Sequence, residues 1–100
     1  MNVISKRGLT ELMNSANLDR DTGDELGEWY RTARAASWST LLEVQAAFPK
    51  ADQIGHVLVF DIRHNRYRLV TRVDFSKQKL YIKAVLTHKE YDRKEWKKWA

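Results

Sequence analysis

Four side chains that can carry out chemistry lie within six residues near the end of the chain, in the sequence T-H-K-E-Y-D at Thr87–Asp92. His88 can exchange a proton near neutral pH. The phenol of Tyr91 can donate a hydrogen bond or a proton, and the carboxylate of Glu90 can orient either group. The apolar sequence LYIKAVL precedes them. Two interpretations are open: an acid–base cluster at a strand end, or the polar loop that any strand needs.

Several other kinds of site are excluded by what the sequence lacks. It has no cysteine, which excludes a disulfide scaffold, a thiol nucleophile and a Cys-based zinc site. It has no Walker-type glycine loop, no G-x-S-x-G and no H-E-x-x-H. Because the three histidines also lack metal-ligand spacing, we expect no metal ion and no other cofactor.

The positive charge belongs to the second half of the sequence. Residues 1–50 carry six Lys/Arg against seven Asp/Glu, whereas residues 51–100 carry twelve against six. A polyanion, most simply a nucleic acid, is the natural partner of such a surface. The alternative is that these cations only keep an edge-rich sheet soluble. No run is long enough to span a membrane and no signal peptide is recognisable, so we expect a cytoplasmic protein without membrane contact.

The elements that would position the cluster change type near Pro49, from helices to strands. Because no flexible linker separates the two halves, we expect residues 1–100 to form one domain. Residues 1–50 are predicted to be mostly helical, after a short strand in MNVIS. Apolar residues recur at helical spacing over 9–16 and again from Asp19 onward. STLLEVQAAFP predicts a short third helix, with capping-box spacing between Thr40 and Glu43.

Residues 56–87 are predicted to form three strands, HVLVFDI, RYRLVTRVDF and KLYIKAVLT, and residues 93–100 form a basic tail. The short connections RHN and SKQ make neighbouring strands antiparallel. The predicted fold class is therefore α+β, with N-terminal helices packed on one face of a small antiparallel sheet that includes the N-terminal strand.

Alternation along the strands predicts one apolar and one basic side of this sheet. In the last strand, Leu80, Ile82, Ala84 and Leu86 are expected to face the helices, with Val85 on the basic side. A solvated sheet face usually mixes both signs of charge, so a face with almost no acid favours phosphate binding. The predicted basic face carries Arg66, Arg68, Arg72, Lys79, Lys83 and the aromatic Tyr81.

A basic sheet without a metal can cleave RNA, because RNA supplies the 2′-hydroxyl as its own nucleophile. The protein then needs an acid, a base and cations that stabilise the charged phosphorane. We predict His88 as the acid–base residue, with Arg68 and Lys83 holding the phosphate and Tyr91 stacking, orienting or transferring a proton. Three of the residues in and around the cluster have simpler alternatives. His88 could be an ordinary surface histidine, Tyr91 could pack under the C-terminal segment, and Glu90 could cap or pair with a neighbouring lysine.

The segment from Ala47 to Asp92 resembles the HigB-type toxins of bacterial type II toxin–antitoxin modules, within the RelE-like superfamily of mRNA interferases. The resemblance is carried by AFPKAD, VFDI, NRYRLV and LYIKAVLTHKEYD, with VISKRGL and LLEVQAAFP also similar. It implies a RelE-like fold with RNA on the sheet face opposite the helices. It also implies mRNA cleavage, commonly on translating ribosomes, and neutralisation by a HigA-type helix-turn-helix antitoxin, whose complex with the toxin binds operator DNA.

The resemblance places functional residues at Asn65, Arg68, His88, Glu90 and Tyr91. It also places Lys83 at a position where the family often has a basic residue. We therefore expect catalysis by His88, Tyr91 and Arg68. RNA binding is expected from Lys83, Asn65, Arg66, Arg72, Lys79, Tyr81 and Glu90.

Two departures from the family pattern stand out. RHN replaces a common glycine pair before the asparagine, and the tail RKEWKKWA is unusually basic and aromatic. The tail could be an added RNA or ribosome contact, an added helix, disorder, or a solvated tail anchored by its tryptophans. Two rival functions also remain: a non-catalytic RNA-binding module, and a protein-binding domain whose basic face meets an acidic partner.

Overall fold

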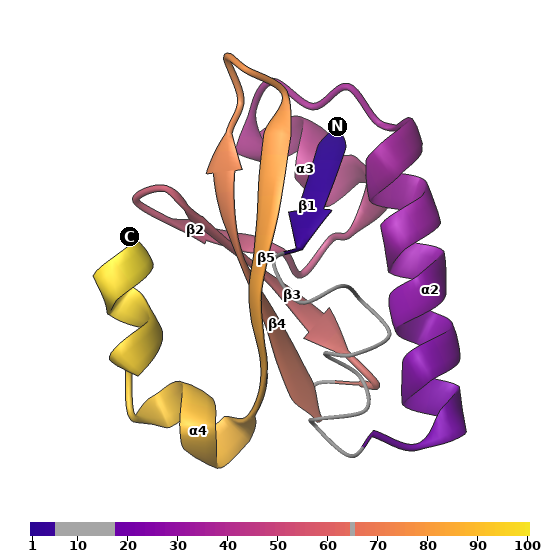
Figure 1. Ribbon diagram of the computed structural model, residues 1–100, viewed down its shortest axis with the longest axis vertical. Helices are drawn as coiled ribbons and strands as arrows, with labels where there is room; N and C mark the ends of the chain where they lie inside the picture. The colour runs from indigo at the N-terminus through magenta and orange to yellow at the C-terminus, as the bar shows by residue number, and fades with distance from the viewer. Residues whose placement is uncertain (6–17, 65) are drawn as a thin grey trace.

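Five strands form one sheet within residues 1–5, 18–64 and 66–100, the part of the chain that the computed structural model describes. They are β1 (Asn2–Ser5), β2 (Asp52–Ile54), β3 (Val57–Ile62), β4 (Tyr67–Asp74) and β5 (Lys79–Thr87), in the spatial order β1-β5-β4-β3-β2 (Figure 1). The predicted α+β class and the antiparallel meander β3-β4-β5 are confirmed. The helical stripe predicted over 9–16 lies outside the described residues, as does Asn65.

The sheet differs from the predicted one at both edges. β1 pairs with β5 in parallel, which makes the sheet mixed rather than antiparallel. A parallel pair needs a long connection, and residues 6–78 separate the two strands along the chain. At the other edge, β2 adds a short antiparallel partner to β3. Its three residues are too few to show a period, which is why alternation does not reveal it.

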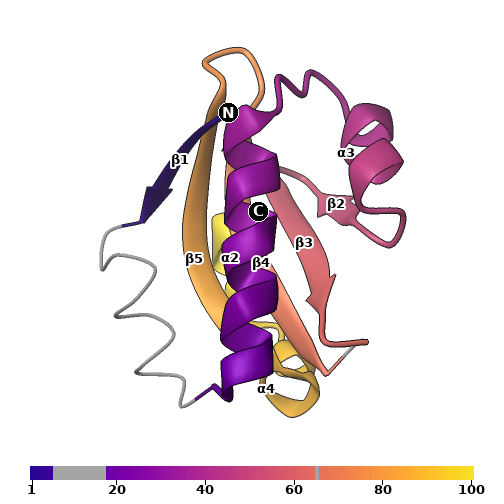
Figure 2. The ribbon, with the colours of Figure 1, turned by 90° about the vertical axis from the view of Figure 1, so that its right-hand side faces the viewer.

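Helix α2 (Arg20–Ala35) covers one face of the sheet (Figure 2). The carboxylate of Asp19 caps its start by accepting a hydrogen bond from the Thr22 amide at 2.8 Å. Leu26, Trp29 and Ala33 recur at helical spacing and are buried against the sheet, where Trp29 meets Phe60 edge-on at 5.3 Å. We call this side of the sheet the α2 face.

Helix α3 (Leu41–Ala47) is short, and its position matches the predicted third helix. The Thr40 hydroxyl accepts a hydrogen bond from the Glu43 amide at 3.4 Å, which is half of the predicted capping box. Val44 is fully buried, whereas Leu42 is 77% exposed. The helix therefore presents only a narrow apolar stripe to the core.

The opposite side, which we call the α4 face, has a smaller core of its own. The chain after β5 forms helix α4 (His88–Asp92) and the 3-10 helix η1 (Glu95–Trp99). Trp96 packs with Val57, Val59 and Val70, and Tyr91, Leu86 and Trp99 surround them. Of the alternatives for the tail, the structure shows an added helix with a buried tryptophan. This segment covers part of the sheet face predicted to be basic and open.

A β-bulge in β5 changes which of its side chains face the helices. The register between β4 and β5 shifts between Val70 and Thr71, so Ala84 lies opposite Val70 and Ile82 opposite Thr71. Val85 therefore belongs to the core on the α2 face, and Leu86 packs on the α4 face. The predicted facing of Ala84, Val85 and Leu86 is wrong, because one extra residue reverses alternation beyond the bulge.

Candidate functional site

The predicted acid–base cluster forms the junction of β5 and α4. The Thr87 hydroxyl accepts a hydrogen bond from the Glu90 amide at 3.3 Å, and the Glu90 carboxylate accepts one from the Thr87 amide at 3.0 Å. This capping box makes His88 the first residue of α4, where its ring is exposed. Glu90 therefore serves as a helix cap, the simpler of the roles considered for it.

Tyr91 and Arg68, from different elements, lie together at this end of the sheet. The Arg68 guanidinium carbon is 5.5 Å from the centroid of the Tyr91 ring, within the range of a cation–π contact. The Arg68 guanidinium also pairs with the Asp61 carboxylate at 3.2 Å, and both side chains are largely buried, at 15% and 20% exposure. Asp61 was not among the predicted site residues.

Trp96 completes the cluster from η1. Its indole ring stacks on the Tyr91 ring with centroids 4.8 Å apart and planes within 7°. Its N–H donates a hydrogen bond to the Tyr91 carbonyl at 2.9 Å. Arg68, Tyr91 and Trp96 thus form a continuous stack, which we call the Tyr91 column, with Asp61 at its Arg68 end.

The surroundings of Tyr91 make its phenol harder to ionise. Burial raises its pKa above the ordinary value of 10.0, and the positive charge of Arg68 only partly opposes this. At neutral pH the phenol is therefore an uncharged hydrogen-bond and proton donor.

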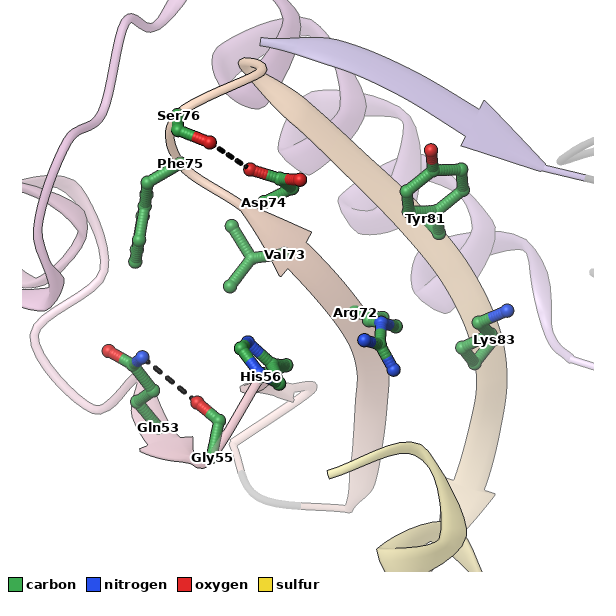
Figure 3. A pocket seen from close by; sticks show the side chains of 10 residues that line it. All are labelled: Gln53, Gly55, His56, Arg72, Val73, Asp74, Phe75, Ser76, Tyr81 and Lys83. Carbon is green, nitrogen blue, oxygen red and sulfur yellow. Dashed lines mark hydrogen bonds between the residues drawn. The ribbon is translucent and has the colours of Figure 1, made fainter.

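A second group of predicted residues lines a broad hollow near the other end of the same face (Figure 3). Arg72, Tyr81 and Lys83 come together there with Gln53 and His56, in a volume of about 990 Å³. Tyr81 lies opposite Arg72 across the β4–β5 pair, and the Lys83 ammonium is 5.7 Å from the Tyr81 ring centroid. His56 was not among the predicted site residues.

Among the described residues, a single carboxylate, Asp74, lines this hollow, and its own turn holds it. Asp74 accepts a hydrogen bond from the Ser76 hydroxyl at 2.7 Å (Figure 3) and another from the Lys77 amide at 3.1 Å. These bonds lower the pKa of Asp74 below its ordinary value of 3.8, and the bond from the Ser76 hydroxyl has the largest effect. The end of η1 borders the hollow, because Arg72 donates to the Trp99 carbonyl at 3.3 Å.

A comparison with known proteins identifies the family. Residues 22–94 match the family model described as HigB_toxin, the RelE-like toxic component of a toxin-antitoxin system. The chain belongs to this HigB toxin family. The match includes β3, β4, β5 and α4 and ends before Trp96, and it confirms the resemblance seen in the sequence motifs.

Curated relatives carry HigB names. The "mRNA interferase toxin HigB" of Escherichia coli strain K12 is 42% identical over 52 residues, which are 49% of this chain and 50% of the relative. The "mRNA interferase HigB" of Escherichia coli O6:H1 is 28% identical over 67 residues, 64% of this chain and 65% of the relative. The chain therefore matches about half the length of the first of these HigB proteins.

The remaining predicted residues of this HigB-family chain are dispersed. Lys79 begins β5 opposite Asp74. Arg66 precedes β4 and lies 3.9 Å from Asp19 at the start of α2, toward the α2 face rather than the hollow. The described part of the structure contains no helix long and apolar enough to cross a membrane.

The turn that departs from the family pattern keeps a glycine-like backbone. Arg63 and His64 have φ values of 55° and 50°, a left-handed conformation that glycine adopts without strain. The Arg63 amide donates to the Glu25 carboxylate of α2 at 2.7 Å, and the Arg63 guanidinium lies 3.9 Å from Asp21. Contacts with α2 thus hold Arg63 and His64 in this left-handed turn without glycine.

Proposed function

We propose that this chain is the toxin of a type II toxin–antitoxin system and cleaves mRNA as an endoribonuclease. The observation that carries the proposal is the contact of Tyr91 with Arg68 next to the exposed His88, within the region that matches the HigB family. Relatives named mRNA interferase support the substrate class. We place the reaction in the cytoplasm, on mRNA bound to ribosomes.

The proposed reaction uses the 2′-hydroxyl of the RNA as nucleophile and needs no metal ion. One group removes the 2′-hydroxyl proton as its oxygen bonds to phosphorus, and a second group protonates the 5′-oxygen as its bond to phosphorus breaks. The products are a 2′,3′-cyclic phosphate and a 5′-hydroxyl. His88 acts as an acid–base residue and Tyr91 assists with its protonated phenol.

The cations divide between the two parts of the α4 face. Arg68 places its charge beside Tyr91 and stabilises the phosphorane, since charge–charge stabilisation grows stronger away from water. Arg72 and Lys83 hold flanking phosphates in the hollow, where Tyr81 offers a ring for a base. These two parts are four residues apart along β4, roughly 13 Å, a distance that a short single strand can bridge.

The experiment that tests this function compares wild type with His88→Ala and Arg68→Ala. Primer extension on a reporter mRNA, with and without ribosomes, detects cut ends, and induced cultures report growth arrest. We expect each variant to lose about 100-fold or more in cleavage, since His88→Ala removes an acid–base group and Arg68→Ala removes a charge that stabilises the transition state. Arg34→Ala, at an exposed position near the end of α2, is the matched control and should cut like wild type. If both variants cleave mRNA as well as wild type does, the mechanism is wrong.

The hollow favours one rival, a non-catalytic RNA-binding module. Such a protein would bind RNA in a salt-dependent way and leave no cut ends in the same primer-extension experiment.

We further propose neutralisation by a HigA-type helix-turn-helix antitoxin. Operator DNA would then be bound only through the toxin–antitoxin complex. Co-expression with a HigA-type antitoxin should abolish both growth arrest and cleavage.

A further inference from the structure

The indole of Trp96 directs both of its specific contacts at a single residue, Tyr91. Its only polar atom, the ring N–H, donates to the Tyr91 carbonyl at 2.9 Å, and its ring lies nearly parallel to the Tyr91 ring. One contact fixes the backbone of Tyr91 and the other fixes its side chain. Because Trp96 is itself only 4% exposed, it has little freedom to move with Tyr91.

Packing alone does not account for this arrangement. A buried indole N–H usually finds a hydrogen-bond partner, but covering Val57, Val59 and Val70 does not require that partner to be Tyr91, nor a parallel stack on the Tyr91 ring. The stack also leaves Tyr91 adjacent to a second restraint, the Arg68 guanidinium, which Asp61 holds in turn. The Tyr91 ring is therefore held from η1 and from β4 at once.

We propose that Trp96 is a positioning residue for Tyr91, and that η1 is thereby part of the catalytic site rather than an appendage to it. This inference rests on the role of Tyr91 in the proposed function. It adds a residue beyond the segment 22–94 that matches the family. Trp96 makes no contact with RNA in this scheme, and it acts only through the ring and backbone that it holds.

The expected kinetic signature follows from this division of roles. A misplaced Tyr91 slows the chemical step, and misplacement by about 1 Å can reduce a rate 100-fold. RNA affinity comes from Arg72 and Lys83 in the hollow and should change little. Loss of Trp96 should therefore lower kcat and leave KM nearly unaltered.

The test measures cleavage of the reporter mRNA on ribosomes by Trp96→Ala and Trp96→Phe, each at a temperature where circular dichroism shows it folded. We expect Trp96→Ala to lower kcat about 10-fold or more with KM within about twofold, and Trp96→Phe to recover most of the rate because phenylalanine can still stack. Leu42→Ala removes an exposed apolar side chain from α3 and should retain wild-type kcat.

A double-mutant cycle separates a positioning role from a general structural one. If Trp96 acts through the Tyr91 hydroxyl, Trp96→Ala should cost little more once Tyr91→Phe has removed that hydroxyl. Equal losses in both backgrounds, or a folded Trp96→Ala protein with wild-type kcat, would overturn the inference.

A second readout does not depend on cleavage. In protein labelled with 3-fluorotyrosine, the Tyr91 fluorine resonance, assigned by its absence in Tyr91→Phe, should shift in Trp96→Ala as the indole ring current is lost. An unmoved resonance would refute the positioning role, even if wild type cleaves RNA. Absence of wild-type cleavage with a shifted resonance would instead refute the proposed function and leave the stack established.

Discussion

At the residue scale, the most consequential contact is the ion pair of Arg68 with Asp61. The two residues lie directly opposite each other in the β3–β4 pair, so the short turn between the strands sets the contact. The pair leaves the Arg68 guanidinium with a fixed direction toward Tyr91. Sequence reasoning found Arg68 and Tyr91 through their motifs, but it missed Asp61 because a single acid in an apolar strand gives no signal of its own.

The Asp74 carboxylate makes the stability of the fold depend on pH. Its pKa is lowered in the folded state, first by the Ser76 hydroxyl and then by the Lys77 amide, so the ionised carboxylate favours folding. This stability is present above the ordinary pKa of 3.8 and is lost as pH falls through the lower folded-state value. We expect Asp74→Asn to destabilise the protein at pH 7 and to flatten the loss of stability in acid. Urea unfolding at pH 7 and at pH 3 measures both effects, and equal pH slopes for the two proteins would contradict the assignment.

At the element scale, α4 depends on its cap. It has five residues, too few to be stable by itself, and it carries both His88 and Tyr91. The Thr87–Glu90 capping box and the packing of Tyr91 on Trp96 hold it on the end of β5. The positions of the proposed acid–base groups therefore depend on the cap at the start of α4.

Thr87→Ala removes the capping hydroxyl and should cost about 1 kcal/mol of folding free energy. We expect cleavage to fall as well, because the first turn that orients His88 becomes frayed. Thr87→Ser keeps the hydroxyl and is the matched control, with nearly wild-type stability and activity. Chemical denaturation and the primer-extension rate measure the two quantities. Full activity of a folded Thr87→Ala protein would show that the cap does not position the site.

The elements that local patterns determine were predictable, and those that depend on distant partners were not. The three C-terminal strands and α2 follow from periods of 2 and 3.6 residues in the sequence. The bulge that turns Val85 inward depends on the β4–β5 register, and the burial of Trp96 depends on an apolar strip supplied by β3 and β4. Neither the bulge nor the burial of Trp96 can be recognised in the local sequence pattern.

At the scale of the whole molecule, one sheet carries a core on each of its two sides. On the α4 face, η1 lies between the Tyr91 column and the hollow. Both cores share the same strands, which supports our proposal of a single domain for residues 1–100. The basic face was predicted as continuous, but η1 covers its middle. The hollow keeps Arg72, Tyr81 and Lys83 and gains His56, which only the β2–β3 turn brings there.

The hollow should give RNA binding a measurable dependence on salt. We expect the affinity of a His88→Ala protein for a short single-stranded RNA to fall steeply with salt, because bound phosphates release counterions. Adding Lys83→Gln should reduce the slope of log K against log salt by about one phosphate contact. Arg31→Gln, on an exposed position of α2, should leave the slope unchanged. Fluorescence anisotropy measures these slopes, and an unaltered slope for Lys83→Gln would remove it from the RNA path.

The parallel pairing of β1 with β5 has a consequence for when the molecule can fold. Residues 2–5 find their partners at 79–82, near the opposite end of the chain. A growing polypeptide can form the β3–β4 hairpin early, but its first strand waits until most of the sequence has been synthesised. Contacts so distant along the chain close slowly, since the entropy of a long loop is lost before any pairing is gained. We therefore expect the β1–β5 pair, and the α4 segment that follows β5, to form later than the β3–β4 hairpin, because both need residues beyond 78.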